Sequence, residues 1–163
     1  MSDPALSHVD DEGKVKMVDV AAKTPTRRVA EASCLIVSSI DPTTLSGPAD
    51  GLSPLTAARL AGIFAAKNTA NLIPLCHPLA LHDVSVDIER HARGAEVRSR
   101  VVTVDRTGVE MEALTACAFA ALSLVNALLE RDPTASVHDA VVLSKSGGAS
   151  GDWTRAAGVV RAP

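Results

Sequence analysis

Cys76 and His77 place a thiol and an imidazole side by side within the segment Leu72 to Leu79. Pro74 and Pro78 flank the pair, and a proline both fixes its own φ and biases the preceding residue towards an extended backbone. We therefore expect the two side chains to be presented rigidly, which suits a binding site. The alternative interpretation is a buried thiol beside a loop histidine that only satisfies backbone groups.

Two carboxylates, Glu110 and Glu112, begin a predicted helix. The positive end of the helix dipole favours their ionised form. An ionised carboxylate can accept hydrogen bonds from the donors of a heterocyclic base. Thr107 and Glu110 have the spacing of a capping box, which by itself would explain Glu110. Glu112 projects about 200° round the helix from Glu110 and has no such structural role, so it is the better functional candidate.

Positive charge and glycines gather in the segment Lys145-Ser146-Gly147-Gly148-Ala149-Ser150-Gly151. Glycine amides can approach an anion closely, so this segment predicts binding of a small phosphate group, although it lacks the Walker form. A flexible tail is the alternative. Lys23 and the adjacent pair Arg27-Arg28 add cations near the N-terminus, where an exposed, solvated face explains them equally well.

The elements that position these residues are read from hydrophobic periodicity. The apolar run from Cys34 to Ser39 predicts a buried strand. Ser53 can cap a helix that begins at Pro54. In this first helix, the residues that follow at helical spacing are Leu60, Ile63, Phe64 and Lys67.

Later in the chain, side-chain type alternates with a period of two over 84–88 and over 97–103, and Arg93-Gly94 separates the two runs. This pattern predicts a β-hairpin. A second helix is expected from Glu110 to about Arg131, with an apolar stripe made of Leu114, Cys117, Ala121, Leu124 and Leu128. Residues 137–143 supply a final strand.

The resulting order, β-α-β-β-α-β, predicts an α+β fold of the ferredoxin-like class, an antiparallel sheet with two helices on one face. We expect an extended N-terminal arm over 1–30, a single domain over 31–152 and a C-terminal tail over 153–163. The open face of the sheet needs another cover, and oligomerisation is one economical cover.

Composition excludes several functions. The chain of 163 residues is 47% hydrophobic and 21% charged, as expected of one soluble globular domain. A net charge of −3 and only three aromatic residues argue against nucleic acid. The three cysteines show no CxxC spacing and are expected to be reduced, and no metal site is predicted. Because no signal sequence and no apolar run of about 20 residues is apparent, we expect a cytoplasmic protein that binds no membrane.

Five segments together resemble one family: 17–20, 59–67, 72–79, 107–116 and 145–151. They are similar to the cyclic pyranopterin monophosphate synthase (MoaC) family of molybdenum cofactor biosynthesis, and the resemblance runs from about His8 to Asp152. It implies a homohexamer, a trimer of dimers, with active sites between subunits. It also implies a lyase reaction in which 3′,8-cyclo-7,8-dihydro-GTP is rearranged to cyclic pyranopterin monophosphate with loss of pyrophosphate. No cofactor is implied, and Mg²⁺ would enter only with the nucleotide's phosphates.

The resemblance also assigns site residues by position. The residues that match pterin and nucleotide contacts are Leu75, Cys76, His77, Met111 and Glu112. The residues that match cations near the phosphates are Lys23, Arg28, Lys67 and Lys145. The candidate catalytic residues are His77, Glu112 and Asn126.

Three positions depart from the family's pattern. Gly51 stands where the family usually has a lysine, Asn126 where it has an aspartate, and Leu129 where it has a second lysine. Asparagine has no ionisable proton and leucine cannot stabilise charge, although general acid-base assistance is worth about 10²- to 10⁴-fold in rate. Asn126 also lies about 21 Å along the helix from Glu112, so one ligand that contacts both positions must lie between subunits.

Three interpretations therefore stay open on the sequence. The chain is a working synthase in which another residue replaces the lost lysines. Alternatively, it is a binding or regulatory paralogue that keeps the fold, the oligomer and part of the pocket without turnover. In the third interpretation the shared motifs serve only as core and interface, and the protein binds no ligand.

Overall fold

The computed structural model describes residues 8–10, 12–47, 49 and 51–156 of the chain. Residues 1–7 of the predicted arm and 157–163 of the predicted tail lie outside this range. The division into arm, domain and tail stays a prediction.

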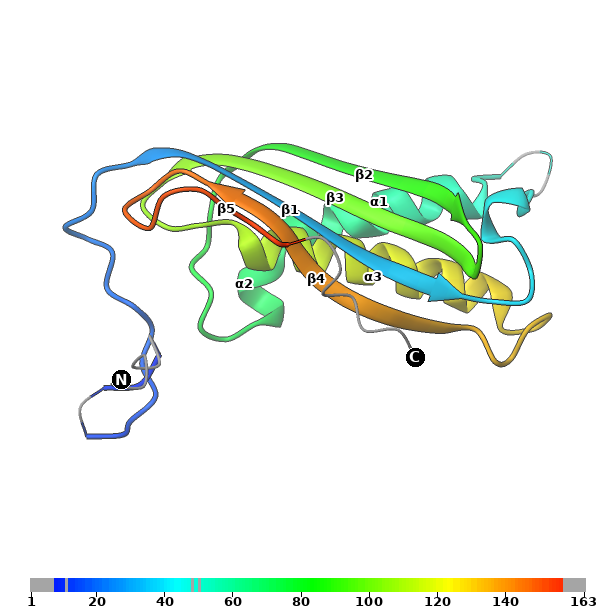
Figure 1. The fold of residues 1–163 in the computed structure, drawn as a ribbon, viewed down its shortest axis with the longest axis horizontal. Coiled ribbons are helices and arrows are strands. Elements are labelled where there is room, and N and C mark those ends of the chain that lie inside the picture. Colours follow the sequence, from blue (N-terminus) through cyan, green and yellow to red (C-terminus); the bar gives the residue numbers. More distant parts are fainter. Residues whose placement is uncertain (1–7, 11, 48, 50, 157–163) are drawn as a thin grey trace.

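A five-stranded antiparallel sheet forms one layer of the molecule (Figure 1). Its strands follow the order β2-β3-β1-β4-β5. Their bounds are β1 (Thr26–Val37), β2 (Leu81–His91), β3 (Gly94–Asp105), β4 (Ser136–Ser146) and β5 (Trp153–Thr154). The first four strands and two long helices confirm the predicted α+β, ferredoxin-like arrangement. The structure adds two details: β1 starts inside the predicted arm, and β5 pairs Trp153 with Lys145 in what was predicted to be tail.

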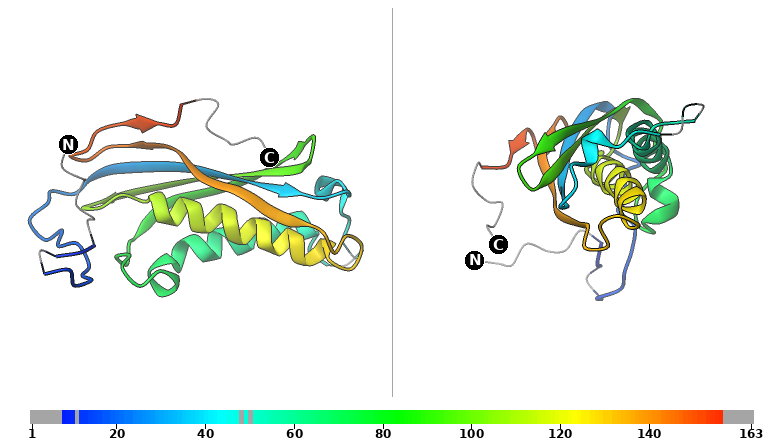
Figure 2. Two further views of the ribbon diagram at one scale, coloured as in Figure 1. Left: turned by 60° about the horizontal axis from the view of Figure 1, so that its bottom comes forward. Right: turned by 90° about the vertical axis from the view of Figure 1, so that its right-hand side faces the viewer.

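The helices lie together on one face of the sheet, as Figure 2 shows for the two long ones. They are α1 (Pro54–Lys67), the short α2 (Thr69–Leu72) and α3 (Glu110–Leu128), and a 3₁₀ turn, η1 (Pro42–Thr44), follows β1. Ser53 caps α1 as predicted, because its hydroxyl accepts a hydrogen bond from the amide of Thr56 at 3.2 Å. The second helix ends at Leu128, earlier than the predicted end near Arg131.

The core lies between the sheet and the helices. The predicted stripe of α3 is confirmed at Cys117, Ala121, Leu124 and Leu128, which are fully buried. The helical spacing predicted for 60–67 is confirmed, but two of the residues that carry it, Leu60 and Phe64, are exposed. The buried residues of α1 are instead Ala58, Gly62, Ala65 and Ala66. Small side chains are buried here because α1 packs so closely against α3 that larger ones do not fit.

Gly62 marks the tightest point of this contact. A Cβ at Gly62 would lie 2.7 Å from the carbonyl oxygen of Ala116 and 3.1 Å from the Cβ of Ala120, both on α3. Only a residue without a side chain lets the two helices approach to this distance. The Gly62 contact therefore fixes how α1 lies on α3.

α3 is long and apolar enough to cross a membrane by length and composition alone. The prediction that no apolar run approaches that length is thus wrong, because the alanines of α3 extend its apolar stretch beyond the larger hydrophobic residues. Half of this stretch is buried inside the protein, where it packs against the sheet and α1. We therefore interpret α3 as a core helix.

Asp132 ties together the end of the molecule where α3 leads into β4. Its buried carboxylate accepts hydrogen bonds from the hydroxyl of Ser38 at 2.8 Å, the amide of Ser39 at 2.7 Å and the hydroxyl of Thr134 at 2.6 Å. These donors hold the pKa of Asp132 well below its usual range. The end of β1 and the α3–β4 turn are fixed to each other by this one side chain.

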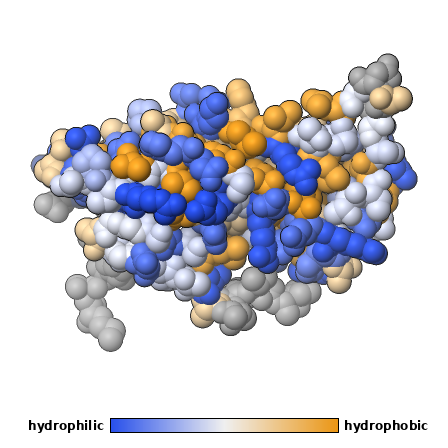
Figure 3. Space-filling model, turned by 90° about the horizontal axis from the view of Figure 1, so that it is seen from above, coloured by the Kyte–Doolittle hydropathy of each residue, from blue (hydrophilic) through white to orange (hydrophobic). Residues whose placement is uncertain are grey.

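Large hydrophobic side chains are also exposed on the helix layer. Phe64 is 69% exposed, and both phenylalanines of the chain, Phe64 and Phe119, are at the surface, together with Leu60 and Leu122. Figure 3 shows hydrophobic residues gathered between patches of hydrophilic ones on the side seen from above. Exposed apolar side chains that lie together are typical of a surface that contacts another protein chain.

Replacing Gly62 by alanine tests the close helix contact. Alanine in mid-helix normally stabilises a helix by about 1 kcal/mol relative to glycine. Here we expect Gly62→Ala to destabilise the fold by about 1–3 kcal/mol, because the added methyl group must push the backbone of α3 away. Urea unfolding of the two proteins measures the difference. A more stable variant would show that α1 and α3 do not pack this closely.

Candidate functional site

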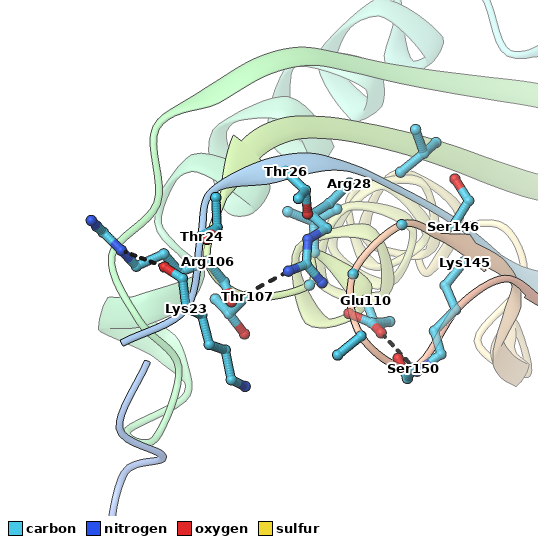
Figure 4. A pocket seen from close by; sticks show the side chains of 16 residues that line it. Lys23, Thr24, Thr26, Arg28, Arg106, Thr107, Glu110, Lys145, Ser146 and Ser150 are labelled. Carbon is cyan, nitrogen blue, oxygen red and sulfur yellow. Dashed lines mark hydrogen bonds and ion pairs between the residues drawn. The ribbon is translucent and has the colours of Figure 1, made fainter. Parts of the chain in front are cut away.

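One end of the molecule gathers loops from four parts of the chain: the start of β1, the turn from β3 to α3, the loop between β4 and β5, and the segment after α2 (Figure 1). A cavity of about 580 Å³ lies among the first three, and we call it the basic cavity (Figure 4). Its cationic side chains are Lys23, Arg28, Arg106 and Lys145. Four cations and one carboxylate, Glu110, line it, so the basic cavity favours an anion.

Arg28 is held in the basic cavity with part of its hydrogen-bonding capacity unused. Its Nη2 donates to the carbonyl oxygen of Arg106 at 3.4 Å, while its Nε is buried and has no partner among the described residues. A buried donor without a partner costs free energy. A bound anion would supply the missing acceptor. Arg106 is fixed in turn, because its Nε donates to the carbonyl oxygen of Lys23 at 3.0 Å.

The glycines of the β4–β5 loop bring backbone close to Arg28. Gly147 and Gly148 adopt φ values of +87° and +83°, which L-residues with side chains rarely adopt. A Cβ at Gly148 would overlap the guanidinium of Arg28. The amide of Gly147 donates to the carboxylate of Asp152 at 3.0 Å and so closes the loop. The glycine-rich segment is therefore an ordered wall of the cavity and not a flexible tail.

Glu110 does not have the role that the capping box predicted. α3 begins at Glu110 itself, and its N-cap residue, Val109, makes no side-chain capping bond. The carboxylate of Glu110 instead lies 3.3 Å from the Nζ of Lys145. The capping-box prediction fails because a lysine on the neighbouring strand competes successfully for this carboxylate. Glu110 is thus the counter-ion that the protein itself supplies to the basic cavity.

A second cavity, of about 280 Å³, continues from the first, and we call it the central cavity. The two share Lys23, Thr107, Gly108 and Glu110. The central cavity is also lined by His8, Val18, Leu75, Cys76, His77, Leu79, Met111 and Glu112. A smaller hollow beyond it, of about 100 Å³, is lined by Lys67 together with His77 and Glu112. The three spaces are therefore neighbours, and each of them is lined by at least one cation.

Glu112 is the buried titratable group of the site. Only 4% of it is exposed, and burial raises its pKa to about 7, to which the negative charge of Glu110 adds. The prediction that the helix dipole keeps Glu112 ionised is therefore wrong, because loss of hydration outweighs the dipole. A carboxyl group with a pKa near 7 can both donate and accept a proton at neutral pH.

Cys76 responds to the same surroundings. Burial raises the pKa of its thiol, and the charge of Glu112 raises it further. The thiol consequently stays protonated at neutral pH and is a weak nucleophile. Its neighbour His77 lines both the central cavity and the hollow around Lys67.

The structure brings together most of the residues that sequence reasoning selected. Lys23, Arg28 and Lys145 line the basic cavity, and Lys67 lies at the other end of the site. The selected residues that line the central cavity are Leu75, Cys76, His77, Met111 and Glu112. This grouping was not visible in the sequence, where the residues are spread over more than a hundred positions.

Asn126 is not brought to this end within one chain. It is exposed near the end of α3, about 21 Å along the helix from Glu112, and the exposed Leu129 follows it. α1 begins towards that same end of the molecule (Figure 1), and Gly51 precedes its first residue, Pro54, by three positions. The three positions that depart from the resembled family's pattern, all within the described part of the chain, line none of the cavities around His77.

Two lining residues were missed by the sequence reasoning. Arg106 directly precedes Thr107-Gly108, and its position between a predicted strand and a predicted helix was the available signal. His8 lies in the N-terminal arm, where nothing in its local pattern predicted that it lines a cavity together with Cys76 and His77. Among the described residues, no group of three or more His, Cys, Asp or Glu is arranged to hold a metal ion.

Gly148→Ala tests the link between the glycine loop and the anion. The added Cβ displaces the guanidinium of Arg28, so we expect pyrophosphate to bind roughly tenfold more weakly. Gly151→Ala is the matched control, since Gly151 also has a positive φ, +67°, but nothing lies within 4 Å of its Cβ position. Isothermal titration calorimetry measures both variants. Equal losses in the two would attribute the effect to backbone strain alone.

Glu112→Gln tests the buried carboxyl. Its pKa in the folded protein, about 7, lies above its ordinary value of 4.5, so ionisation costs stability as pH rises through this interval. Neutral glutamine avoids that cost. We expect the variant to be more stable than wild type by on the order of 1 to 3 kcal/mol at pH 8, and by little at pH 4. Urea unfolding of both proteins at the two pH values measures this difference in stability. A stability difference that does not depend on pH would contradict a raised pKa.

The chain is similar to known proteins over most of its length. The profile of the MoaC family matches residues 17–148. A protein of Thermomicrobium roseum named cyclic pyranopterin monophosphate synthase is 46% identical over 156 residues, which cover 92% of this chain and 93% of the relative. A protein of the same name from a Nocardioides species is 47% identical, with 92% and 95% covered. Cyclic pyranopterin monophosphate synthase 2 of Mycobacterium tuberculosis is 45% identical, with 92% and 91% covered.

Proposed function

This chain belongs to the MoaC family, and from that premise we propose that it converts 3′,8-cyclo-7,8-dihydro-GTP into cyclic pyranopterin monophosphate with release of pyrophosphate. Its function lies in molybdenum cofactor biosynthesis, and its substrate is of the pterin or nucleotide type. One observation supports the specific reaction: a cavity lined by four cations shares part of its wall with a cavity lined by His77 and Glu112.

The two cavities suit the two parts of such a substrate. The basic cavity offers Lys23, Arg28 and Lys145, and a triphosphate needs several cations to balance its charge. The central cavity has apolar walls, among them Leu75 and Met111, against which a flat heterocycle can pack. The nucleotide would thus lie with its phosphates against the glycine loop and its ring system beside His77.

Proton transfer would be carried out in the central cavity. Glu112, with a pKa of about 7, can take a proton from the substrate and return it at neutral pH. His77 lines the same small hollow as Glu112 and Lys67 and can orient or protonate a substrate oxygen or nitrogen. The cations of the basic cavity would stabilise the negative charge of the departing pyrophosphate. Mg²⁺ would accompany the phosphates, and no other cofactor is proposed.

We place the complete site between subunits of a homohexamer, built as a trimer of dimers. The exposed hydrophobic side chains of the helix layer, such as Phe64 and Leu122, support a contact between copies. Asn126 lies at the far end of the molecule from Glu112, so only another subunit's copy can approach the same ligand. We expect the assembly to be cytoplasmic and to bind neither nucleic acid nor membranes.

A second candidate function is a paralogue that binds a nucleotide or pterin without turnover. The observation that favours it is the absence of an ionisable side chain at Gly51, Asn126 and Leu129. The names and high identity of the relatives favour the synthase. The two candidates share the fold and the pocket, and they differ only in the rate of the reaction.

The test is incubation with freshly prepared cyclised GTP intermediate, in which pyrophosphate and cyclic pyranopterin are measured beside the Nocardioides relative. We expect product, formed more slowly than by the relative. The combined variant Gly51→Lys, Asn126→Asp, Leu129→Lys is expected to raise the rate by about 10²- to 10⁴-fold if these positions supply acid-base groups. The three single variants, each of which restores only one group, are the controls.

The outcomes separate the candidates. Product from the wild type supports the synthase. Bound substrate without product, together with activity gained only by the combined variant, supports the paralogue. If neither GTP nor pyrophosphate binds the wild type at millimolar concentration, both candidate functions are wrong.

A further inference from the structure

The N-terminal arm supplies three residues to the central cavity. Val18 and Lys23 line the central cavity, and so does His8, which lies much earlier in the chain. The arm is attached close to the site, because the carbonyl oxygen of Lys23 accepts a hydrogen bond from Arg106 at 3.0 Å. One wall of the central cavity is therefore formed by a segment that precedes the sheet.

The part of the arm that carries His8 is folded by its own hydrogen bonds. Val9 and Val15 form a β-bridge, and the amide of Lys16 donates to the carbonyl oxygen of His8 at 3.0 Å. The carboxylate of Asp10 accepts the amide of Lys14 at 2.8 Å and stabilises the turn. His8 is thus part of a small hairpin with a defined shape.

The imidazole of His8 has an unused polar atom. Its Nδ1 is buried and finds no hydrogen-bond partner among the described residues, although the side chain lines the central cavity. Buried polar groups are nearly always paired, and an imidazole nitrogen can donate or accept according to its tautomer. An unpaired nitrogen in a cavity wall is explained when a ligand supplies the partner.

The position of His8 limits which part of a ligand it can contact. It lines the central cavity with Leu75, Cys76 and Met111. Of the four cations, Lys23 lines both cavities, and the other three, Arg28, Arg106 and Lys145, line only the basic cavity. A phosphate group is attracted to those cations. The part of a nucleotide that remains for the central cavity is the heterocycle and its attached sugar, which carry hydrogen-bonding nitrogen and oxygen atoms.

We propose that His8 binds the heterocyclic part of the nucleotide through a hydrogen bond at Nδ1, so that the N-terminal arm is an integral wall of the substrate site. This inference rests on the proposed function. It adds a binding residue outside the sheet and helices, and it makes the selectivity for the ring system depend on His8, which does not line the basic cavity.

The experiment compares two probes on each variant by isothermal titration calorimetry: GTP, which has both parts, and pyrophosphate, which has only the charged part. His8→Phe keeps an aromatic ring without its nitrogens, and His8→Asn restores a polar atom close to the Nδ1 position. His82→Phe is the matched control, because His82 is exposed on β2. We expect His8→Phe to weaken GTP binding by about 5- to 100-fold and to leave pyrophosphate binding unchanged. His8→Asn should recover most of the loss, and His82→Phe should match the wild type.

Each result has one meaning. If the wild type binds GTP and His8→Phe binds it equally well, the inference is wrong and the proposed function stands. Equal weakening of GTP and pyrophosphate by His8→Phe would also overturn the inference, since a ring contact cannot affect pyrophosphate. If the wild type binds neither probe, the proposed function itself fails.

A measurement on the unaltered protein covers the case in which a His8 variant misfolds. The wild type is labelled with ¹⁵N in its histidine rings, and GTP is added to saturation. A new hydrogen bond at Nδ1 shifts the resonance of that nitrogen, and pyrophosphate alone should not reproduce the shift. An unchanged His8 resonance in the GTP-saturated protein would refute the contact.

Discussion

The close contact of α1 with α3 is the constraint on which the site depends. Because Gly62 lets the two helices touch through backbone and small side chains, the end of α1 is fixed beside the start of α3. That neighbourhood places Lys67, His77 and Glu112 round one hollow. It also removes water from Glu112, and the raised pKa follows from that burial. The proton-transfer properties of the site thus originate in helix packing.

Local patterns with a strict period could be predicted from the sequence. The alternation of Val84, Val86 and Ile88 gave the correct hairpin because one face of each strand is buried, and Ser53 and Pro54 gave the correct start of α1 because capping depends on adjacent residues only. The fold class followed from the order of these elements. The candidate site was partly predictable too, since Cys76, His77 and Glu112 were selected by chemistry and their segments by family resemblance.

Features that depend on a distant neighbour were not predictable. Leu60 and Phe64 have the correct helical spacing for a core, but the proximity of α3 leaves room there only for alanine and glycine. Glu110 has the correct spacing for a capping box, but its carboxylate forms an ion pair with Lys145 of β4 instead. Arg106 and His8 join the site through tertiary folding alone. In each case the competing partner lies more than thirty residues away.

The edge strand β5 carries the residue that dominates the fluorescence of this protein. Trp153 is the only tryptophan in a chain without tyrosine. It pairs with Lys145 of β4, and the guanidinium of Arg155 lies 5.6 Å from its ring centroid. Indole emission is sensitive to nearby charge, and Lys145 is a cation of the basic cavity. Nearly all of the native fluorescence therefore arises next to the place where an anion would bind. The molecule carries a built-in reporter of that cavity's occupancy, and no label has to be attached.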